Sequence, residues 1–123
     1  MSDTGTEKKK LTIMLVKAPY VSEAADMALK TALGAKRMGY DVSIFLYLDG
    51  AWNSHIVEEK NYNNPGEWIR SVLHRGISVT CCERCANARD LTKENMIDGV
   101  RITGSYPFMD LLMDSDKVLS FGG

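Results

Sequence analysis

A chain of 123 residues with 45% hydrophobic content is long enough to bury a core and short enough to form one domain. Its 15 basic and 16 acidic residues give a formal net charge of -1, which argues against a nucleic-acid binder because such proteins need a basic surface. No apolar run approaches the ~20 residues of a membrane-spanning helix. The sequence therefore predicts a single globular unit without a nucleic-acid or membrane role.

The amino-terminal part divides into a polar tail and the start of a folded domain. Residues 1–10 are polar and are expected to be a disordered tail, leaving residues 11–123 as one α/β domain. Leu11 to Val16 is a continuous apolar run, typical of a central parallel strand that is covered on both faces. We expect this run to be the first strand of the sheet.

A helix and a second strand follow. Ser22 is a candidate N-cap, the next residues carry apolar side chains at helical spacing, and Gly39 is a suitable stop signal. Val42 to Leu48 then predicts the second strand, which ends at Asp49-Gly50. The polar stretch from Asn53 to Asn64 is expected to be a long loop.

The middle of the chain repeats the alternation of helix and strand. Asn64-Pro65 predicts the start of a helix that ends at Gly76, and a third strand is expected from Ile77 to about Cys81. A helix from Glu83 to Leu91 follows, and a shorter helix is expected to begin near Thr92.

The carboxyl-terminal part adds two strands. They are expected at Val100 to Thr103 and at Lys117 to Phe121, separated by a helix that Ser105 can cap. Five strands separated by helices predict an α/β fold, a three-layer α/β/α sandwich around a mainly parallel five-stranded sheet. Sites in such sheets form beyond the carboxyl ends of the strands, where the cysteines, Asp49-Gly50 and the segment Lys17 to Tyr20 are all expected.

All three cysteines of the chain lie within five positions, at Cys81, Cys82 and Cys85. An odd number of clustered cysteines, without a secretory signal, argues against a disulfide framework and predicts reduced thiols in a cytoplasmic protein. The cluster follows an expected buried strand and precedes an expected helix, where free backbone N–H groups favour the thiolate form. The cluster is therefore the candidate reactive site.

Several interpretations of the cysteines compete. Cys81 could simply fill space in the core, because free cysteine is often buried. A zinc or iron–sulfur site lacks a fourth ligand apart from His55, His74 and scattered carboxylates, so no metal and no cofactor are expected. The spacing Cys82-Glu83-Arg84-Cys85 also suits a reversible dithiol.

The remaining interpretation is sulfur carriage, which needs one activated thiolate and nearby cations. Cys82 satisfies both conditions best, because Arg84 and Arg89 are close to it in sequence. Cys85 lies one turn further along and could attack a loaded Cys82 or be a core residue. His55 follows Asp49-Gly50 in a loop that could fold over the cysteines and supply a base.

The order and spacing of several short segments resemble those of the DsrE/DsrF-like family, which includes the TusD-type sulfur relay proteins. The resemblance spans nearly the whole domain. Its segments are Leu11 to Val16, Phe45 to Gly50, Cys82 to Arg89, Gly99 to Ile102 and Asp116 to Gly122.

The resemblance implies an α/β sandwich that assembles as trimers or hexamers. It also implies a cytoplasmic sulfurtransferase that passes sulfur between rhodanese-like and TusA-like proteins. Cys82 matches the cysteine that carries sulfur in the family, and Asp49 matches an acidic residue that precedes a glycine. The chain departs from the family pattern at Asp90, where glycine is common, and in the adjacent pair Cys81-Cys82.

Taken together, the sequence predicts a sulfur carrier whose reactive cysteine is Cys82, with Cys81 and Cys85 as further candidates. Arg89, Asp49 and His55 are the expected supporting residues. The alternative is a redox-sensing or assembly module that forms a Cys82–Cys85 disulfide and carries no sulfur.

Overall fold

The computed structural model describes residues 9–20, 22–56 and 65–122, and it has the expected α/β sandwich. Its five strands are β2 (Lys10–Leu15), β3 (Asp41–Leu46), β4 (Ser78–Cys82), β5 (Arg101–Thr103) and β6 (Lys117–Phe121). They form one sheet in the order β5-β4-β3-β2-β6, and every neighbouring pair is parallel.

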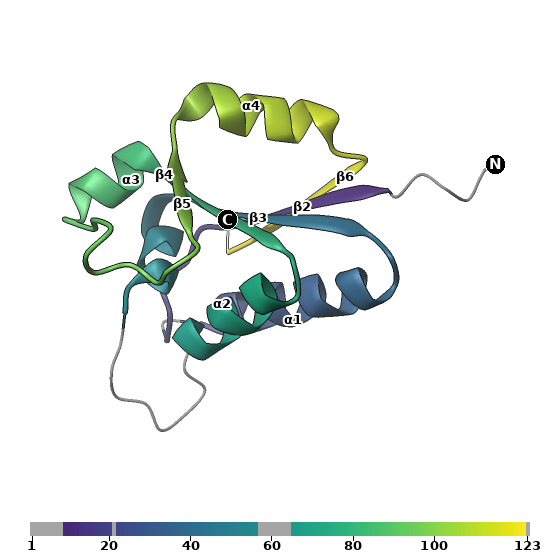
Figure 1. The fold of residues 1–123 in the computed structure, drawn as a ribbon, viewed down its shortest axis with the longest axis horizontal. Helices are drawn as coiled ribbons and strands as arrows, with labels where there is room; N and C mark the ends of the chain where they lie inside the picture. The colour runs from purple at the N-terminus through teal and green to yellow at the C-terminus, as the bar shows by residue number, and fades with distance from the viewer. Residues whose placement is uncertain (1–8, 21, 57–64, 123) are drawn as a thin grey trace.

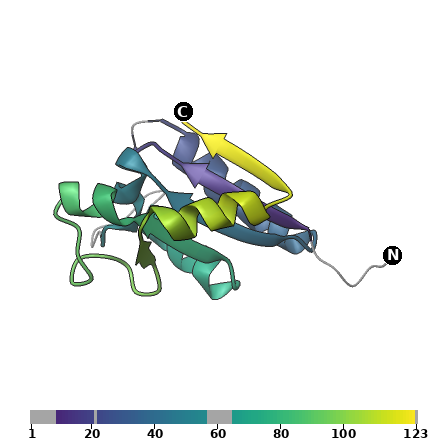
Figure 2. The same cartoon turned by 90° about the horizontal axis from the view of Figure 1, so that it is seen from above.

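The helices cover both faces of this sheet. They are α1 (Ala24–Arg37), α2 (Pro65–His74), α3 (Glu83–Ala88) and α4 (Ser105–Asp114), with a 3-10 helix, η1 (Leu48–Ser54), after β3. Figure 1 shows α1 and α2 on one face and α4 on the other, with α3 beyond the strand ends. Seen from above in Figure 2, α4 runs across the strands while α3 lies apart from it.

The core lies between the sheet and the pair α1 and α2. Ile13, Leu15, Ile44 and Leu46 alternate along two adjacent strands and are fully buried there, as the apolar runs predict. The opposite face is less well covered, since none of the α4 residues is fully buried. Phe108 makes the main aromatic contact of α4, stacking on Phe45 of β3 at 3.7 Å between ring centroids.

The observed boundaries refine the expected ones. β2 begins at Lys10, which pairs with Asp41, so the expected 1–10 tail loses its last residue to the sheet. The rest of that tail, apart from residue 9, and most of the expected 53–64 loop lie outside the described residues. The start of that loop, through Ser54, belongs to η1.

The helix expected to begin near Thr92 is wrong, because this part of the chain forms a turn. The Asn95 side chain accepts the N–H of Thr92 at 2.8 Å and donates to the carbonyl of Asp90 at 3.1 Å. Ile97 then donates its N–H to the carbonyl of Ser54 at 2.8 Å, and this bond holds the segment beside η1. Side-chain bonds of this kind compete with helix formation.

The order of the strands reverses at β2, which lies between β3 and β6. The chain leaves β3 through η1 for α2, and it leaves β4 directly for α3, beyond the strand ends (Figure 1). Open parallel sheets bind ligands beyond the carboxyl ends of their strands. At this end of the sheet, the residues after β3 contact the segment that follows β4, through Leu48 with Cys85 and Asp49 with Arg89.

Candidate functional site

β4 separates the two adjacent cysteines to opposite faces of the sheet. Cys81 pairs with Leu46, is completely buried, and points with Val79 into the core between the sheet and α1 and α2. Cys82 has the opposite orientation and is only partly buried. It is the N-cap of α3, with an extended backbone at φ -63° and ψ 128°. The sequence therefore places two like residues in unlike environments.

Burial makes Cys81 a poor nucleophile. Loss of hydration raises the pKa of the Cys81 thiol to about 12, and the neighbouring Cys82 and Cys85 sulfurs act in the same direction. A hydrogen bond with Ser54 and the charge of Arg89 oppose this shift without cancelling it. Cys81 therefore remains a protonated core residue at neutral pH.

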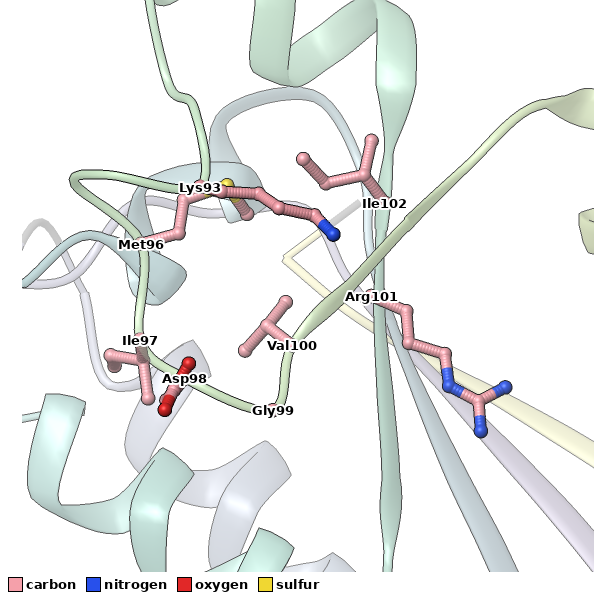
Figure 3. A pocket seen from close by; sticks show the side chains of 8 residues that line it. All are labelled: Lys93, Met96, Ile97, Asp98, Gly99, Val100, Arg101 and Ile102. Carbon is pink, nitrogen blue, oxygen red and sulfur yellow. The ribbon is translucent and has the colours of Figure 1, made fainter.

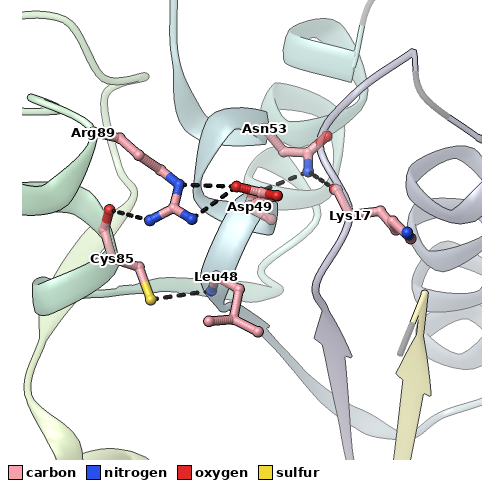
Figure 4. Close-up of polar contacts among 7 residues, drawn as sticks. Lys17, Leu48, Asp49, Asn53, Cys85 and Arg89 are labelled. Carbon is pink, nitrogen blue, oxygen red and sulfur yellow. Dashed lines mark hydrogen bonds and ion pairs between the residues drawn. The ribbon is translucent and has the colours of Figure 1, made fainter.

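Cys85 lies one turn into α3 and contacts the start of η1. Its sulfur accepts the backbone N–H of Leu48 at 3.0 Å (Figure 4), and the residue is 7% exposed. Burial raises the pKa of Cys85, as does its hydrogen bond with Cys82, while the Leu48 N–H and Arg89 lower it. Leu48 has a positive φ of 55°, a strained value for a leucine, so this N–H is held in place by the surrounding fold.

Arg89 ties α3 to η1. Its Nε and Nη2 atoms donate to Oδ1 of Asp49 at 3.2 and 2.7 Å, and its Nη1 atom donates to the carbonyl of Cys85 at 3.0 Å (Figure 4). Two residues that the sequence analysis selected separately therefore form one ion pair. The pair places a guanidinium directly beside the cysteine turn.

η1 is fixed to the sheet by a close backbone contact and a buried amide. A Cβ atom on Gly50 would lie 1.8 Å from the carbonyl oxygen of Leu15, so only glycine fits there. The Asn53 side chain donates to the carbonyls of Lys17 and Gly50 at 2.9 and 3.0 Å (Figure 4). These contacts hold Leu48 and Asp49 beside the segment that follows β4, where they meet Cys85 and Arg89.

Other expected site residues lie apart from the cysteines. His55 packs edge-on against Trp52 at 5.8 Å between ring centroids and pairs with Met96, and no contact with a cysteine sulfur is among its interactions in the described chain. Tyr20 is 61% exposed after β2. Asp49 therefore contributes more to the expected cleft than His55 or Tyr20 does.

Sequence reasoning missed Leu48 and Asn53, which support the site through backbone and amide contacts. Leu48 acts through its N–H, which any residue except proline has, so its side chain gave no signal. Asn53 was counted as loop polarity, whereas it is 1% exposed and bonded to two carbonyls. An asparagine three residues after a glycine at a strand end was the available signal.

α3 is shorter than expected. The helix predicted over residues 83–91 ends at Ala88, where Arg89 forms the C-cap and Asp90 takes a positive φ of 56°. A helix of six residues has a weak macrodipole, so the direct donors, Leu48 N–H and Arg89, are the stronger positive groups near the sulfurs.

A cavity of about 420 Å³ lies at the edge of the sheet next to β5, between that strand and residues 93–100 (Figure 3). Val100 points into it and Arg101 points away. None of the cysteines lines it. Within the described chain, no three His, Cys, Asp or Glu side chains are arranged to hold a metal ion.

A comparison with models of protein families identifies the family of this chain. The model of the DsrE/DsrF-like family matches residues 9–121, almost the whole chain. The chain belongs to the DsrE/DsrF-like family. Among the described residues there is also no helix long and apolar enough to cross a membrane.

Relatives of this DsrE/DsrF-like chain support the assignment in sequence and in structure. The uncharacterized protein MJ0989 of Methanocaldococcus jannaschii is 32% identical over 117 residues, covering 91% of this chain and 99% of that protein. YchN of Escherichia coli is 25% identical over 119 residues, and its crystal structure superposes with a TM-score of 0.84 over 92% of this chain and 99% of YchN. BT1422 of Bacteroides thetaiotaomicron, 22% identical, shares the fold with a TM-score of 0.68 over 91% of this chain and 94% of its own.

The backbone at Asp90 suits the glycine that the family resemblance led us to expect there. Its φ of 56° is in the left-handed region, which glycine enters without strain and which aspartate tolerates better than most residues. Asp90 therefore makes a backbone turn that glycine could also make.

Proposed function

We propose that this protein is a sulfur carrier in which Cys82 accepts a sulfane sulfur or a thiosulfonate group and passes it to a cysteine of a partner protein. The observation that carries the proposal is the partly exposed position of Cys82 at the junction of β4 and α3, one helical turn before the Cys85 carbonyl that Arg89 binds. Family membership supports the same class of role. The protein then acts as a protein-to-protein sulfurtransferase.

Burial ranks the three thiols for this task. Cys81 lies in the core, and Cys85 is 7% exposed, so a donor or a partner protein reaches neither directly. Cys82 is more open than either, and it sits where the chain turns from strand into helix. A partner thiol can therefore approach its sulfur from outside the sheet.

The chemistry requires a thiolate and a nearby positive charge. The Cys82 thiolate attacks the sulfane sulfur of a donor such as thiosulfate, a sulfur–sulfur bond forms, and sulfite leaves with the electron pair of the broken bond. The resulting persulfide is anionic. Arg89 donates to the carbonyl of Cys85, one turn further along the chain than Cys82, and its positive charge is proposed to favour the anionic adduct.

The proposal extends to partners and assembly. Rhodanese-like and TusA-like proteins are the proposed donor and acceptor, and the proposed location of the exchange is the cytoplasm, where clustered unpaired thiols stay reduced. We further propose a homo-oligomer, a trimer or hexamer, because α4 leaves large apolar side chains exposed at Tyr106, Met109 and Met113.

Intact-mass spectrometry after a short exposure to thiosulfate, tetrathionate or polysulfide tests the proposal. The wild type should gain a sulfur-containing adduct that peptide mapping places on Cys82, and Cys82→Ser should gain none. Cys81→Ser is the matched control, since it removes a thiol of the same segment and should load normally. Absence of any adduct, or an equal adduct on Cys82→Ser, would refute the proposal.

The same mass measurement distinguishes the redox alternative from the sulfur carrier. A module that only forms a Cys82–Cys85 disulfide would lose two hydrogens under a mild oxidant and would never gain the mass of sulfur. The observation that favours this alternative is the placement of Cys82 and Cys85 across the first turn of α3, with Cys82 as its N-cap.

A further inference from the structure

We infer that Cys85 is an internal discharging thiol, which attacks the Cys82 sulfur of a loaded carrier, closes a Cys82–Cys85 disulfide and releases the carried sulfur as hydrosulfide. This inference rests on the proposed function, because it begins from a persulfide on Cys82. It adds a second outcome for the carried sulfur besides transfer to a partner.

The placement of Cys85 suits an internal reaction. Its sulfur lies at the junction of α3 and η1, where it accepts the Leu48 N–H at 3.0 Å. The residue is 7% exposed, so an external thiol is excluded, while Cys82 lies three residues earlier as the N-cap of the same helix. Cys85 therefore has Cys82 as its accessible sulfur partner in the described chain.

The backbone at this point allows the bond to close. Residues three apart on a helix have Cβ atoms about 5–6 Å apart, and a disulfide needs about 3.5–4.5 Å. Cys82 is the N-cap of α3, with an extended rather than helical backbone, so a small rotation of this residue can close the difference without breaking the helix. The carbonyl of Cys85 is meanwhile held by Arg89 at 3.0 Å.

The reaction balances without an added oxidant. The Cys85 thiolate attacks Sγ of the Cys82 persulfide, a Cys82–Cys85 bond forms, and the bond between Sγ and the outer sulfur breaks. The outer sulfur leaves as hydrosulfide with the electron pair, and the proton of the Cys85 thiol goes to solvent. The sulfane sulfur is reduced to sulfide and the two cysteines are oxidised.

The Leu48 N–H has a defined role in this step. It points at the Cys85 sulfur and stabilises the negative charge of the thiolate as it forms. Burial raises the pKa of the Cys85 thiol. Thiolate formation is therefore unfavourable, and the discharge is slow at neutral pH. A partner protein that binds before the discharge therefore takes the sulfur. Without a partner, the persulfide is converted to sulfide and a Cys82–Cys85 disulfide.

The test follows the loaded protein after the donor has been removed. Wild type, Cys85→Ser and Cys81→Ser are loaded with sodium polysulfide, desalted, and followed by intact mass and by trapping of sulfide with a bimane reagent. Wild type and Cys81→Ser should lose the adduct, release one sulfide per chain and become two hydrogens lighter than the dithiol. Cys85→Ser should keep its adduct at least about tenfold longer.

Each result is decisive. Equal decay in wild type and Cys85→Ser would overturn the discharge reaction and leave the carrier function standing, whereas no adduct on either protein would overturn both. Peptide mapping of the wild type gives a reading that does not depend on any variant folding. A Cys82–Cys85 cross-link in step with sulfide release supports the inference, and sulfide release without the cross-link overturns it.

Discussion

Cys81 and Cys82 are chemically identical and adjacent, yet the alternation of the strand gives them different properties. One side chain enters the dry core between the sheet and α1 and α2, and the other lies on the α4 face. Desolvation raises the pKa of the first thiol to about 12. A single step along a strand therefore separates a packing residue from the proposed reactive one.

The Cys81 thiol predicts how stability depends on alkaline pH. The folded protein holds this proton up to about pH 12, whereas the unfolded chain releases it near the ordinary pKa of 9.0. Between these values the unfolded state binds fewer protons, so the free energy of unfolding should fall as pH rises. Urea titrations across this range should show a shallower fall for Cys81→Ala than for Cys82→Ala, and equal slopes would contradict the burial argument.

The Asp49–Arg89 pair predicts how anions reach the site. Asp49 occupies two donors of Arg89, so an anionic donor must compete with its carboxylate. Exposed ion pairs are worth up to about 1 kcal/mol, and Asp49→Asn should therefore speed loading by thiosulfate about two- to fivefold. Rates with neutral 4,4′-dithiodipyridine should not change.

Salt and the two donor types separate the possible roles of Asp49. The gain of Asp49→Asn should shrink at high ionic strength, because the competition is electrostatic. Slower loading by both the anionic and the neutral donor would instead mean that Asp49 assists deprotonation of Cys82.

Residue types and strand ends were enough to select Cys82, Cys85, Arg89 and Asp49 from the sequence. The contacts between them were not predictable, because the Asp49–Arg89 pair joins residues 40 positions apart. The Leu48 N–H was equally hidden, since it depends on a left-handed backbone that the fold imposes on a leucine. Sequence therefore supplied these candidate residues and left their mutual geometry open.

At the scale of elements, strong apolar periodicity gave reliable predictions. β2 and β3 fall within two residues of the expected bounds, because continuous apolar runs suit buried parallel strands. β6 has the expected bounds although most of its residues are exposed. The helix expected near Thr92 failed because Asn95 bonds the backbone of the preceding turn. Local side-chain contacts decided that segment, and hydrophobic pattern does not report them.

The contact of η1 with β2 predicts an unusually costly small substitution. Gly50→Ala puts a methyl group 1.8 Å from the Leu15 carbonyl oxygen, so η1 must shift, at a cost of about 3 kcal/mol or more. Gly34→Ala is the matched control, because a Cβ there meets nothing within 4 Å and lies inside α1. The control should gain about 0.5–1 kcal/mol.

Thermal and urea unfolding of the two glycine variants measure these changes. Gly50→Ala should also slow the loading of Cys82, since η1 carries Leu48 and Asp49. Similar stabilities for both variants would show that the backbone of η1 can move away from β2 freely.

For the whole molecule, the notable surface feature is that α4 leaves large apolar side chains exposed to solvent. Tyr106, Met109 and Met113 follow the spacing of one helix face and are 85, 52 and 82% exposed. The opposite side of α4 meets the sheet through Phe108. An apolar stripe of this kind is typical of an interface between protein chains.

The proposed assembly can be tested by comparing lysine substitutions of two exposed methionines. Met113→Lys should shift the molecular mass measured by light scattering toward the monomer, because a charge would enter the apolar interface. Met38→Lys is the control, since Met38 is 77% exposed at the end of α1 on the other face. A wild type that is monomeric, or equal shifts for both variants, would contradict the proposed interface.

The unequal exposure of the three thiols also sets the order of exchange in the proposed relay. Because Cys81 and Cys85 are buried, donor and acceptor must dock one after the other at the Cys82 sulfur. The donor must leave before the acceptor can approach, so the proposed turnover is a double displacement with one sulfur equivalent per chain. Excess donor that occupies this docking position should slow the proposed relay.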